Sequence, residues 1–87
     1  MKISYHPKFK KAFKKRIFPD RKLREKALFR IKLFEENSSH PILKDHKLKG
    51  EKQRLRSFWI TGDIRIVYKI KNDIATFLDI GSHNQVY

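Results

Sequence analysis

A histidine, a tyrosine and an arginine stand at the ends of segments that otherwise read as apolar strands. Arg65 lies inside IRIVYKI, and His83 and Tyr87 follow IATFLDI within the closing GSHNQVY. An imidazole can take or give a proton near neutral pH, and a guanidinium can stabilise negative charge on a phosphate. The sequence contains no cysteine, no P-loop and no G-x-S-x-G motif. This set of residues fits metal-free phosphodiester chemistry, in which an RNA 2′-OH is the internal nucleophile.

The four histidines do not form a metal-binding pattern. His6, His40, His46 and His83 include no i, i+4 pair and have no carboxylate at ligand spacing. We therefore predict neither a metal nor a cofactor. A lone histidine is more often ordinary surface than catalytic, and Arg65 could equally form a cross-strand ion pair.

Charge is the strongest compositional feature of the chain. Its 87 residues include 22 Lys and Arg against 9 Asp and Glu, a net charge of +13. Residues 1–36 are the most basic part, whereas residues 72–87 contain no Lys or Arg. Such a field predicts a polyanionic partner, which could be nucleic acid, the ribosome, an acidic protein or a membrane surface.

The N-terminal stretch MKISYHPKFKKAF has no apolar run of the kind that signal peptides need. No segment approaches the roughly 20 apolar residues of a membrane span. We therefore expect a cytoplasmic protein with no membrane partner.

Two helices and four strands are predicted within a single domain, residues 1–87. Apolar residues recur at helical spacing from Phe9 to Ile17, and the following Pro19 ends this first helix. They recur again from Leu23 to Phe34, in a second helix with an N-cap at Asp20. Strands are predicted at 2–5, 54–60, 64–70 and 74–80, with turns at 61–63 and 71–73. Residues 42–50 fit no single element. The pattern predicts an α+β fold, with a two-helix hairpin packed on one face of a small, mainly antiparallel four-stranded sheet.

The alternation of residues along the strands predicts which side chains share a face. Ile64, Ile66, Tyr68 and Ile70 should face the helices, and Arg65, Val67 and Lys69 the opposite, open surface. On the preceding strand, Leu55, Ser57 and Trp59 share one face, and Arg54, Arg56, Phe58 and Ile60 share the other. A sheet surface with arginines and an aromatic ring suits RNA, because cations contact phosphates and the ring stacks on a base. Trp59 could instead belong to the core.

Three motifs in sequence order carry a family resemblance: DHKLKG at 45–50, RSFWITGDIRIVYKI at 56–70 and IGSHNQVY at 80–87. With the basic helical hairpin before them, they resemble the RelE/ParE superfamily of bacterial toxins from type II toxin–antitoxin systems. The chain is most similar to the YafQ-like branch. The resemblance implies a RelE-like fold and a ribosome-dependent mRNA endonuclease that cleaves the A-site codon and leaves a cyclic phosphate. It also implies three partners: a cognate antitoxin protein, the ribosome and mRNA.

The resemblance also implies roles for individual residues. His83 matches a general acid or base, Arg65 a phosphate clamp, and Tyr87 the terminal aromatic residue at the substrate. His46 and Asp63 match further candidates for proton transfer. The expected RNA-binding residues, including those of the sheet, are Lys47, Lys49, Lys52, Arg54, Arg56 and Trp59.

The sequence departs from the family pattern at several of these positions. YafQ has a histidine where this chain has Trp59 and a hydrophobic residue where it has Arg65, and RelE has an arginine near the position of His83. The sequence thus combines features of two branches, so the assignment of acid and base among His46, Asp63 and His83 stays open. Two other functions also fit: a ParE-like toxin that binds gyrase, and a catalytically inactive module of the same fold that binds RNA or an antitoxin.

Overall fold

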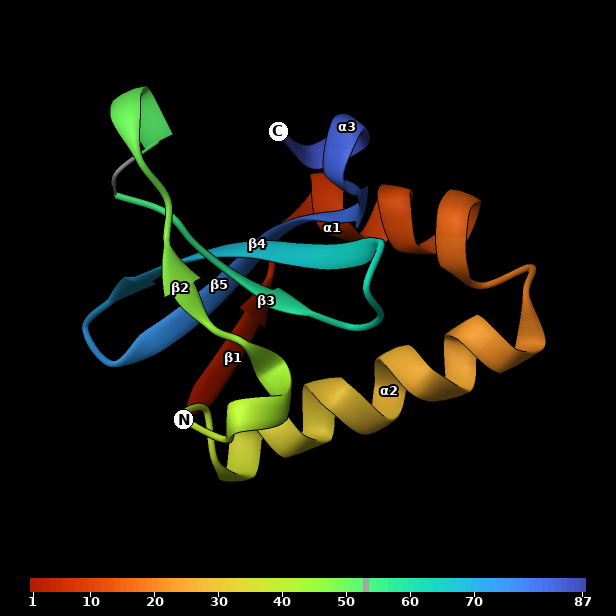
Figure 1. Cartoon of the computed structure of the whole chain (residues 1–87), viewed down its shortest axis with the longest axis horizontal. Helices are drawn as coiled ribbons and strands as arrows, with labels where there is room; N and C mark the ends of the chain where they lie inside the picture. Colours follow the sequence, from red (N-terminus) through yellow and green to blue (C-terminus); the bar gives the residue numbers. More distant parts are fainter. Residues whose placement is uncertain (53) are drawn as a thin grey trace.

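Five strands form one sheet across residues 1–52 and 54–87, the part of the chain that this computed structural model describes (Figure 1). The strands are β1 (Lys2–Tyr5), β2 (His46–Lys47), β3 (Arg56–Trp59), β4 (Ile64–Lys71) and β5 (Ile74–Ser82). Their order in the sheet is β1-β5-β4-β3-β2. β1 runs parallel to β5, and the other neighbouring pairs are antiparallel, so the mainly antiparallel sheet is confirmed.

The sheet has one strand more than the four predicted from the sequence. The additional strand is β2, in which His46 pairs with Ser57 and Lys47 with Arg56. Two residues are too few to show an alternating pattern, so nothing in the sequence distinguishes this strand from loop. Its consequence for the site is that His46 and Lys47 lie at the edge of the sheet beside β3.

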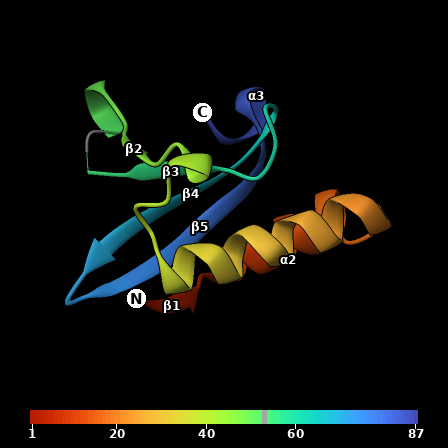
Figure 2. The ribbon, with the colours of Figure 1, turned by 60° about the horizontal axis from the view of Figure 1, so that its bottom comes forward.

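The two predicted helices are confirmed. α1 (Pro7–Ala12) continues into a π-helical turn at Phe13–Ile17, and α2 spans Arg21–Glu36. Asp20 caps α2 as predicted, since its Oδ1 accepts a hydrogen bond from the main-chain N–H of Leu23 at 3.1 Å. Figure 2 shows α2 along one side of the sheet, with a third helix, α3 (His83–Val86), and the C-terminus toward the other side.

Aromatic rings from α2 and the three central strands form the middle of the core. Phe34 of α2 stacks on Phe58 of β3, with ring centroids 4.6 Å apart and planes 10° apart. Tyr68 and Phe77 meet Phe34 edge-on, at 4.9 and 5.5 Å. All four side chains are buried. Rings of this size dominate core energetics. The packing of Phe34 on these rings explains why α2 covers the face of the sheet that carries Ile66 and Tyr68.

A buried arginine fastens α2 to the segments that lead to the site. Arg30 is 9% exposed. Its Nη1 donates hydrogen bonds to the main-chain oxygens of Ile42, at 3.0 Å, and Trp59, at 3.1 Å. The first contact holds the chain before β2, and the second holds the end of β3.

The sheet face away from α2 is less open than predicted. Val67 was expected on the open surface, yet it is 3% exposed. α3, which the sequence did not predict, packs against β4 and β5, and its Val86 is buried as well. α3 therefore covers part of this face and carries His83 over the sheet.

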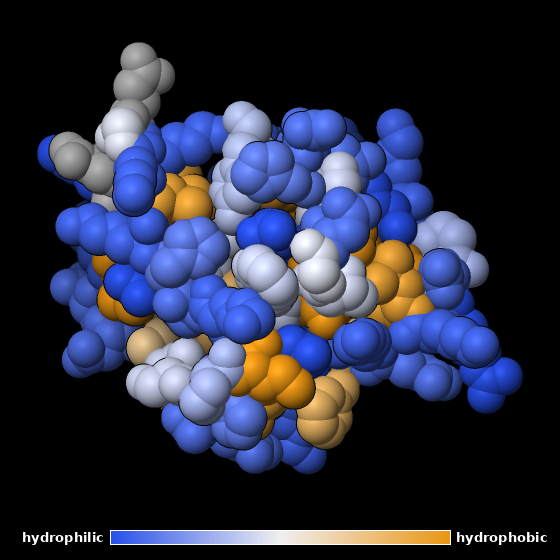
Figure 3. Space-filling model, in the orientation of Figure 1, coloured by the Kyte–Doolittle hydropathy of each residue, from blue (hydrophilic) through white to orange (hydrophobic). Residues whose placement is uncertain are grey.

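Polar side chains cover most of the face seen in the space-filling view, and apolar side chains emerge there only in small groups (Figure 3). Within the described part of the chain, no helix combines the length and apolar character needed to cross a membrane.

Candidate functional site

A pocket of about 360 Å³ brings together residues from segments far apart in the sequence. Its lining consists of His46, Lys47, Leu48, Lys49, Lys52, Arg65, His83 and Tyr87. Seven of these eight residues were predicted as functional from the sequence, and Leu48 was not. Three lysines and an arginine can bind a polyanion, and the two imidazoles among them can act as general acid and base in its cleavage.

His83 enters the pocket at the start of α3. The helix begins there because Gln85 Oε1 accepts a hydrogen bond from the main-chain N–H of Ser82 at 2.8 Å, half of a capping box. The sequence signal for α3 was present, since Ser82 and Gln85 form the S-x-x-Q pattern. The exposed imidazole of His83 meets the edge of the Tyr87 ring, with centroids 4.6 Å apart and an interplanar angle of 79°.

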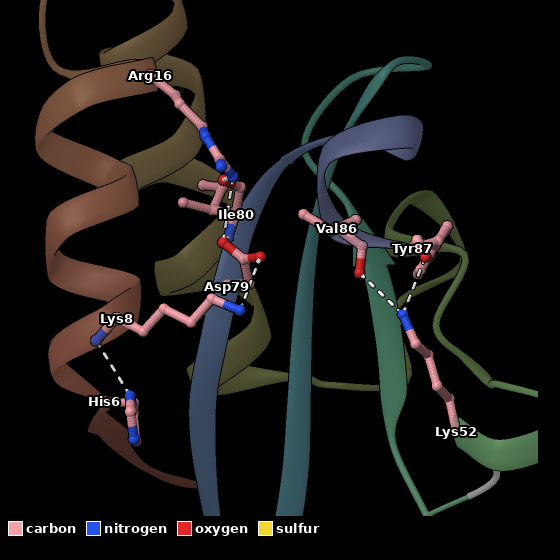
Figure 4. Close-up of polar contacts among 8 residues, drawn as sticks. All are labelled: His6, Lys8, Arg16, Lys52, Asp79, Ile80, Val86 and Tyr87. Carbon is pink, nitrogen blue, oxygen red and sulfur yellow. Dashed lines mark hydrogen bonds and ion pairs between the residues drawn. The ribbon is translucent and has the colours of Figure 1, made fainter.

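Tyr87 is held at both its side chain and its main chain. Its hydroxyl donates a hydrogen bond to Ser57 Oγ at 2.5 Å, and Ser57 is fully buried on β3. Lys52 Nζ donates to the main-chain oxygens of Tyr87, at 3.1 Å, and Val86, at 3.5 Å (Figure 4). These contacts fix the ring beside His83. Ser57 was missed as a site residue, although its place on the Trp59 face is readable from the alternation.

Arg65 reaches the pocket from β4. In the sheet it lies between Trp59 on β3 and Gly81 on β5. Its Nη2 donates a hydrogen bond to the main-chain oxygen of Gly62 at 3.2 Å, and its Cζ lies 4.4 Å from the centre of the Trp59 ring. Arg65 thus forms no ion pair with a carboxylate of the described residues. Its positive charge remains available to a ligand.

His46 faces the pocket from β2 with one nitrogen already committed. Its Nδ1 lies 2.9 Å from the main-chain oxygen of Lys44. A carbonyl oxygen can only accept a hydrogen bond, so Nδ1 carries the proton in the neutral ring. The lone pair of Nε2 is then free to accept a proton from a substrate.

Arg56 lies outside the pocket, on the side of the sheet that faces the helices. Its Nε donates hydrogen bonds to Asp45 Oδ1 at 3.0 Å and to the Tyr68 hydroxyl at 3.3 Å, and the Tyr68 hydroxyl itself donates to Asp45. Burial and the Asp45 carboxylate raise the pKa of the Tyr68 phenol. Asp45 directly precedes His46, so this partly buried network anchors the segment that carries His46.

The remaining predicted residues also lie outside the pocket lining. Asp63 is exposed in the turn between β3 and β4, where Thr61 Oγ1 accepts a hydrogen bond from its main-chain N–H at 3.1 Å. Arg54 is exposed just before β3. Trp59 is half-buried beneath Arg65. In the described residues, no group of three or more His, Asp or Glu side chains is placed to hold a metal ion.

The whole chain matches one protein family. The family model described as "Bacterial toxin of type II toxin-antitoxin system, YafQ" covers residues 1–87. The chain belongs to the YafQ family of toxins. This confirms the resemblance read from the three motifs, and with it the type II toxin–antitoxin class. No match was found among curated protein sequences.

Solved structures of toxins share the fold. YafQ from Escherichia coli superposes with a TM-score of 0.83 at 22% sequence identity, covering 98% of this chain and 96% of that one. YafQ in the E. coli DinJ–YafQ complex gives 0.81 at 23% identity, with coverage of 98% and 96%. A metal-bound toxin from Helicobacter pylori is 30% identical, with a TM-score of 0.73 and coverage of 100% and 99%. The predicted α+β, RelE-like fold is thereby confirmed.

Proposed function

We propose that this YafQ-family toxin is a ribosome-dependent mRNA endonuclease that cleaves mRNA in the A site and so inhibits translation. The observation that supports this most is the pocket itself. It combines two imidazoles, one guanidinium and three ammonium groups, with an aromatic ring fixed beside His83. RNA supplies its own nucleophile, so a site of this composition needs no reactive side chain for covalent attack.

Cleavage by this pocket proceeds by attack of the RNA 2′-OH on the adjacent phosphorus. One imidazole removes the proton of the 2′-OH, and the free Nε2 of His46 suits that step. The other imidazole, His83, protonates the departing 5′ oxygen. Arg65 and the pocket lysines stabilise the charge that develops on the phosphate oxygens, so the displacement requires no metal ion. The products are a 2′,3′-cyclic phosphate and a free 5′-OH.

Replacing His83 by alanine tests the proposal. General acid–base catalysis contributes about 10²- to 10⁴-fold, so His83→Ala should reduce cleavage by that factor. Primer extension on cellular mRNA after brief induction should show in-frame cuts for the wild type and none for the variant. Asn84→Ala is the matched control, because Asn84 is the exposed neighbour on α3 and does not line the pocket.

Growth arrest without mRNA cuts would contradict the endonuclease proposal. It would point instead to a different cellular target of the same toxin fold. Equal cutting by His83→Ala and wild type would leave the nuclease in place but remove His83 from its mechanism.

We also propose that a small antitoxin protein binds and neutralises this toxin. E. coli YafQ forms a complex with DinJ, and the net charge of +13 favours a partner with an acidic segment. Such a segment would order on the basic surface as it binds. Affinity purification from the native host should recover a small acidic protein in stoichiometric amount. Recovery of the toxin alone, under salt conditions that preserve ion pairs, would refute the partner.

A further inference from the structure

Two cations lie over the ring of Trp59, the last residue of β3. The guanidinium carbon of Arg65 is 4.4 Å from the ring centre, and Lys44 Nζ is 5.4 Å from it. Both distances are within the range of a cation–π contact. Arg65 is the direct cross-strand partner of Trp59, so the sheet register itself brings the two side chains together.

This arrangement argues against the sequence-based expectation that Trp59 stacks on RNA. Trp59 is half-buried and does not line the pocket, whereas Arg65 does. A nucleobase would have to compete with Arg65 and Lys44 for the ring. The indole therefore meets the guanidinium of Arg65 rather than the ligand.

Few other contacts hold the Arg65 guanidinium. Its Nη2 makes one hydrogen bond, to Gly62, and its buried Nε has no hydrogen-bond partner among the described residues. The buried Nε1 of Trp59 has none there either. The position of Arg65 thus depends on one hydrogen bond and on the face of one aromatic ring.

We propose that Trp59 is a positioning residue, whose ring holds the Arg65 guanidinium toward the pocket so that it can contact a phosphate of bound RNA. The role of Arg65 toward RNA rests on the proposed nuclease function, but its placement by Trp59 does not. The quadrupole of the ring attracts the cation and its flat face orients the planar group. An aromatic residue at position 59 should therefore preserve the placement, and an aliphatic one should not.

The first test observes Arg65 in the free protein, without RNA or ribosomes. The Nε–H proton of Arg65, detected by NMR and assigned with Arg65→Lys, lies against the indole and should show a ring-current shift. Trp59→Phe should retain a smaller shift, and Trp59→Leu should abolish it. An Arg65 signal that is the same in Trp59→Leu as in the wild type would overturn the proposal.

The second test measures cleavage of mRNA on programmed ribosomes. Trp59→Leu should lower kcat by roughly 3- to 30-fold, the range that a cation–π contact implies. KM should change by less than about twofold, since Arg65 acts on charge that develops in the transition state. Trp59→Phe should recover most of the loss. Lys44→Gln is the control and should leave kcat close to the wild-type value. Lys44 touches the same ring but does not line the pocket.

The two tests separate failure of this inference from failure of the proposed function. If Trp59→Phe loses as much kcat as Trp59→Leu at equal thermal stability, the aromatic face is not what matters and the inference fails. If the wild type does not cleave RNA at all while the NMR signal behaves as expected, Trp59 still positions Arg65 and the nuclease proposal alone is wrong.

Discussion

At the scale of single residues, the site depends on residues that take no part in the chemistry themselves. Gly81, the last residue but one of β5, shows this best. A Cβ added there would lie 2.6 Å from Gln85 Oε1, 3.1 Å from Gln85 Cβ and 2.9 Å from Arg16 Nη1. Gln85 caps α3, and Arg16 Nη1 donates hydrogen bonds to the main-chain oxygen of Ile80 at 3.0 Å and to Asp79 Oδ1 at 3.2 Å on β5 (Figure 4). Because Gly81 has no side chain, both the Gln85 and the Arg16 side chains have space to make these contacts.

We expect Gly81→Ala to loosen α3. The new methyl group displaces the Gln85 side chain, so the N–H of Ser82 loses its cap, which costs about 1–2 kcal/mol. In a chain of this size, a loss of 1 kcal/mol lowers Tm by about 4–8 °C. A thermal melt followed by circular dichroism measures the shift, and amide exchange at Tyr87 should accelerate in the same variant.

Gly62→Ala is the control for this substitution. No atom lies within 4 Å of a Cβ added at Gly62, so its Tm should stay close to that of the wild type. Equal Tm values for both alanine variants would show that the packing around Gly81 does not restrain α3.

At the scale of elements, the two histidines of the pocket are carried by short elements. His46 lies on β2, which has two residues, and His83 begins α3, which has four. Both elements are held by contacts with other parts of the chain: β2 by the Asp45–Arg56–Tyr68 network, and α3 by its packing on β4 and β5. The short elements thus place the two imidazoles, while the longer β4 places Arg65.

This division explains how much of the fold could be predicted from the sequence. α2 and strands β4 and β5 are long enough to repeat their apolar pattern, so their existence was predicted correctly. β2 is too short to have a period. The α3 signal consists only of Ser82 and Gln85, which carry no apolar pattern of their own.

The site was predictable in its members but not in their contacts. Residue types and motif order indicated His83, Arg65 and Tyr87, and the structure brings them together in one pocket. The sequence does not show that Arg56 turns toward Asp45 and Tyr68, because that pairing depends on the β2–β3 and β3–β4 registers. The contact of Trp59 with Arg65 likewise depends on the β3–β4 register.

At the scale of the whole molecule, the positive charge is unevenly distributed between the two long helical segments. Residues 7–17 contain six basic and no acidic residues, whereas α2 contains six basic and three acidic ones. A groove of about 670 Å³ runs along the first segment, lined by Lys8, Lys11, Ala12, Lys14, Lys15, Arg16 and Asp79. Figure 4 shows this helix beside β5, across the sheet from Lys52 and Tyr87. The groove therefore flanks the face that carries the pocket.

We expect this groove along residues 7–17, rather than the total charge of the protein, to govern RNA affinity. The triple substitution Lys11→Gln, Lys14→Gln and Lys15→Gln removes three charges from the groove. For single-stranded RNA, each lost phosphate contact makes the slope of log K against log salt shallower by about 0.7, so the triple variant should lose up to about 2 units of slope. Fluorescence anisotropy with a labelled RNA, in a His83→Ala background that prevents cleavage, measures the slope.

The control removes the same number of charges from α2 instead. Lys22, Lys26 and Lys32 are exposed on α2, which lies on the side of the sheet away from α3. Replacing all three by Gln should change the slope by less than about 0.5. Net charge is then equal in the two triple variants, and only the location of the charge differs. Equal slopes for both would show that RNA senses the overall field of the toxin, and the groove would lose its special role.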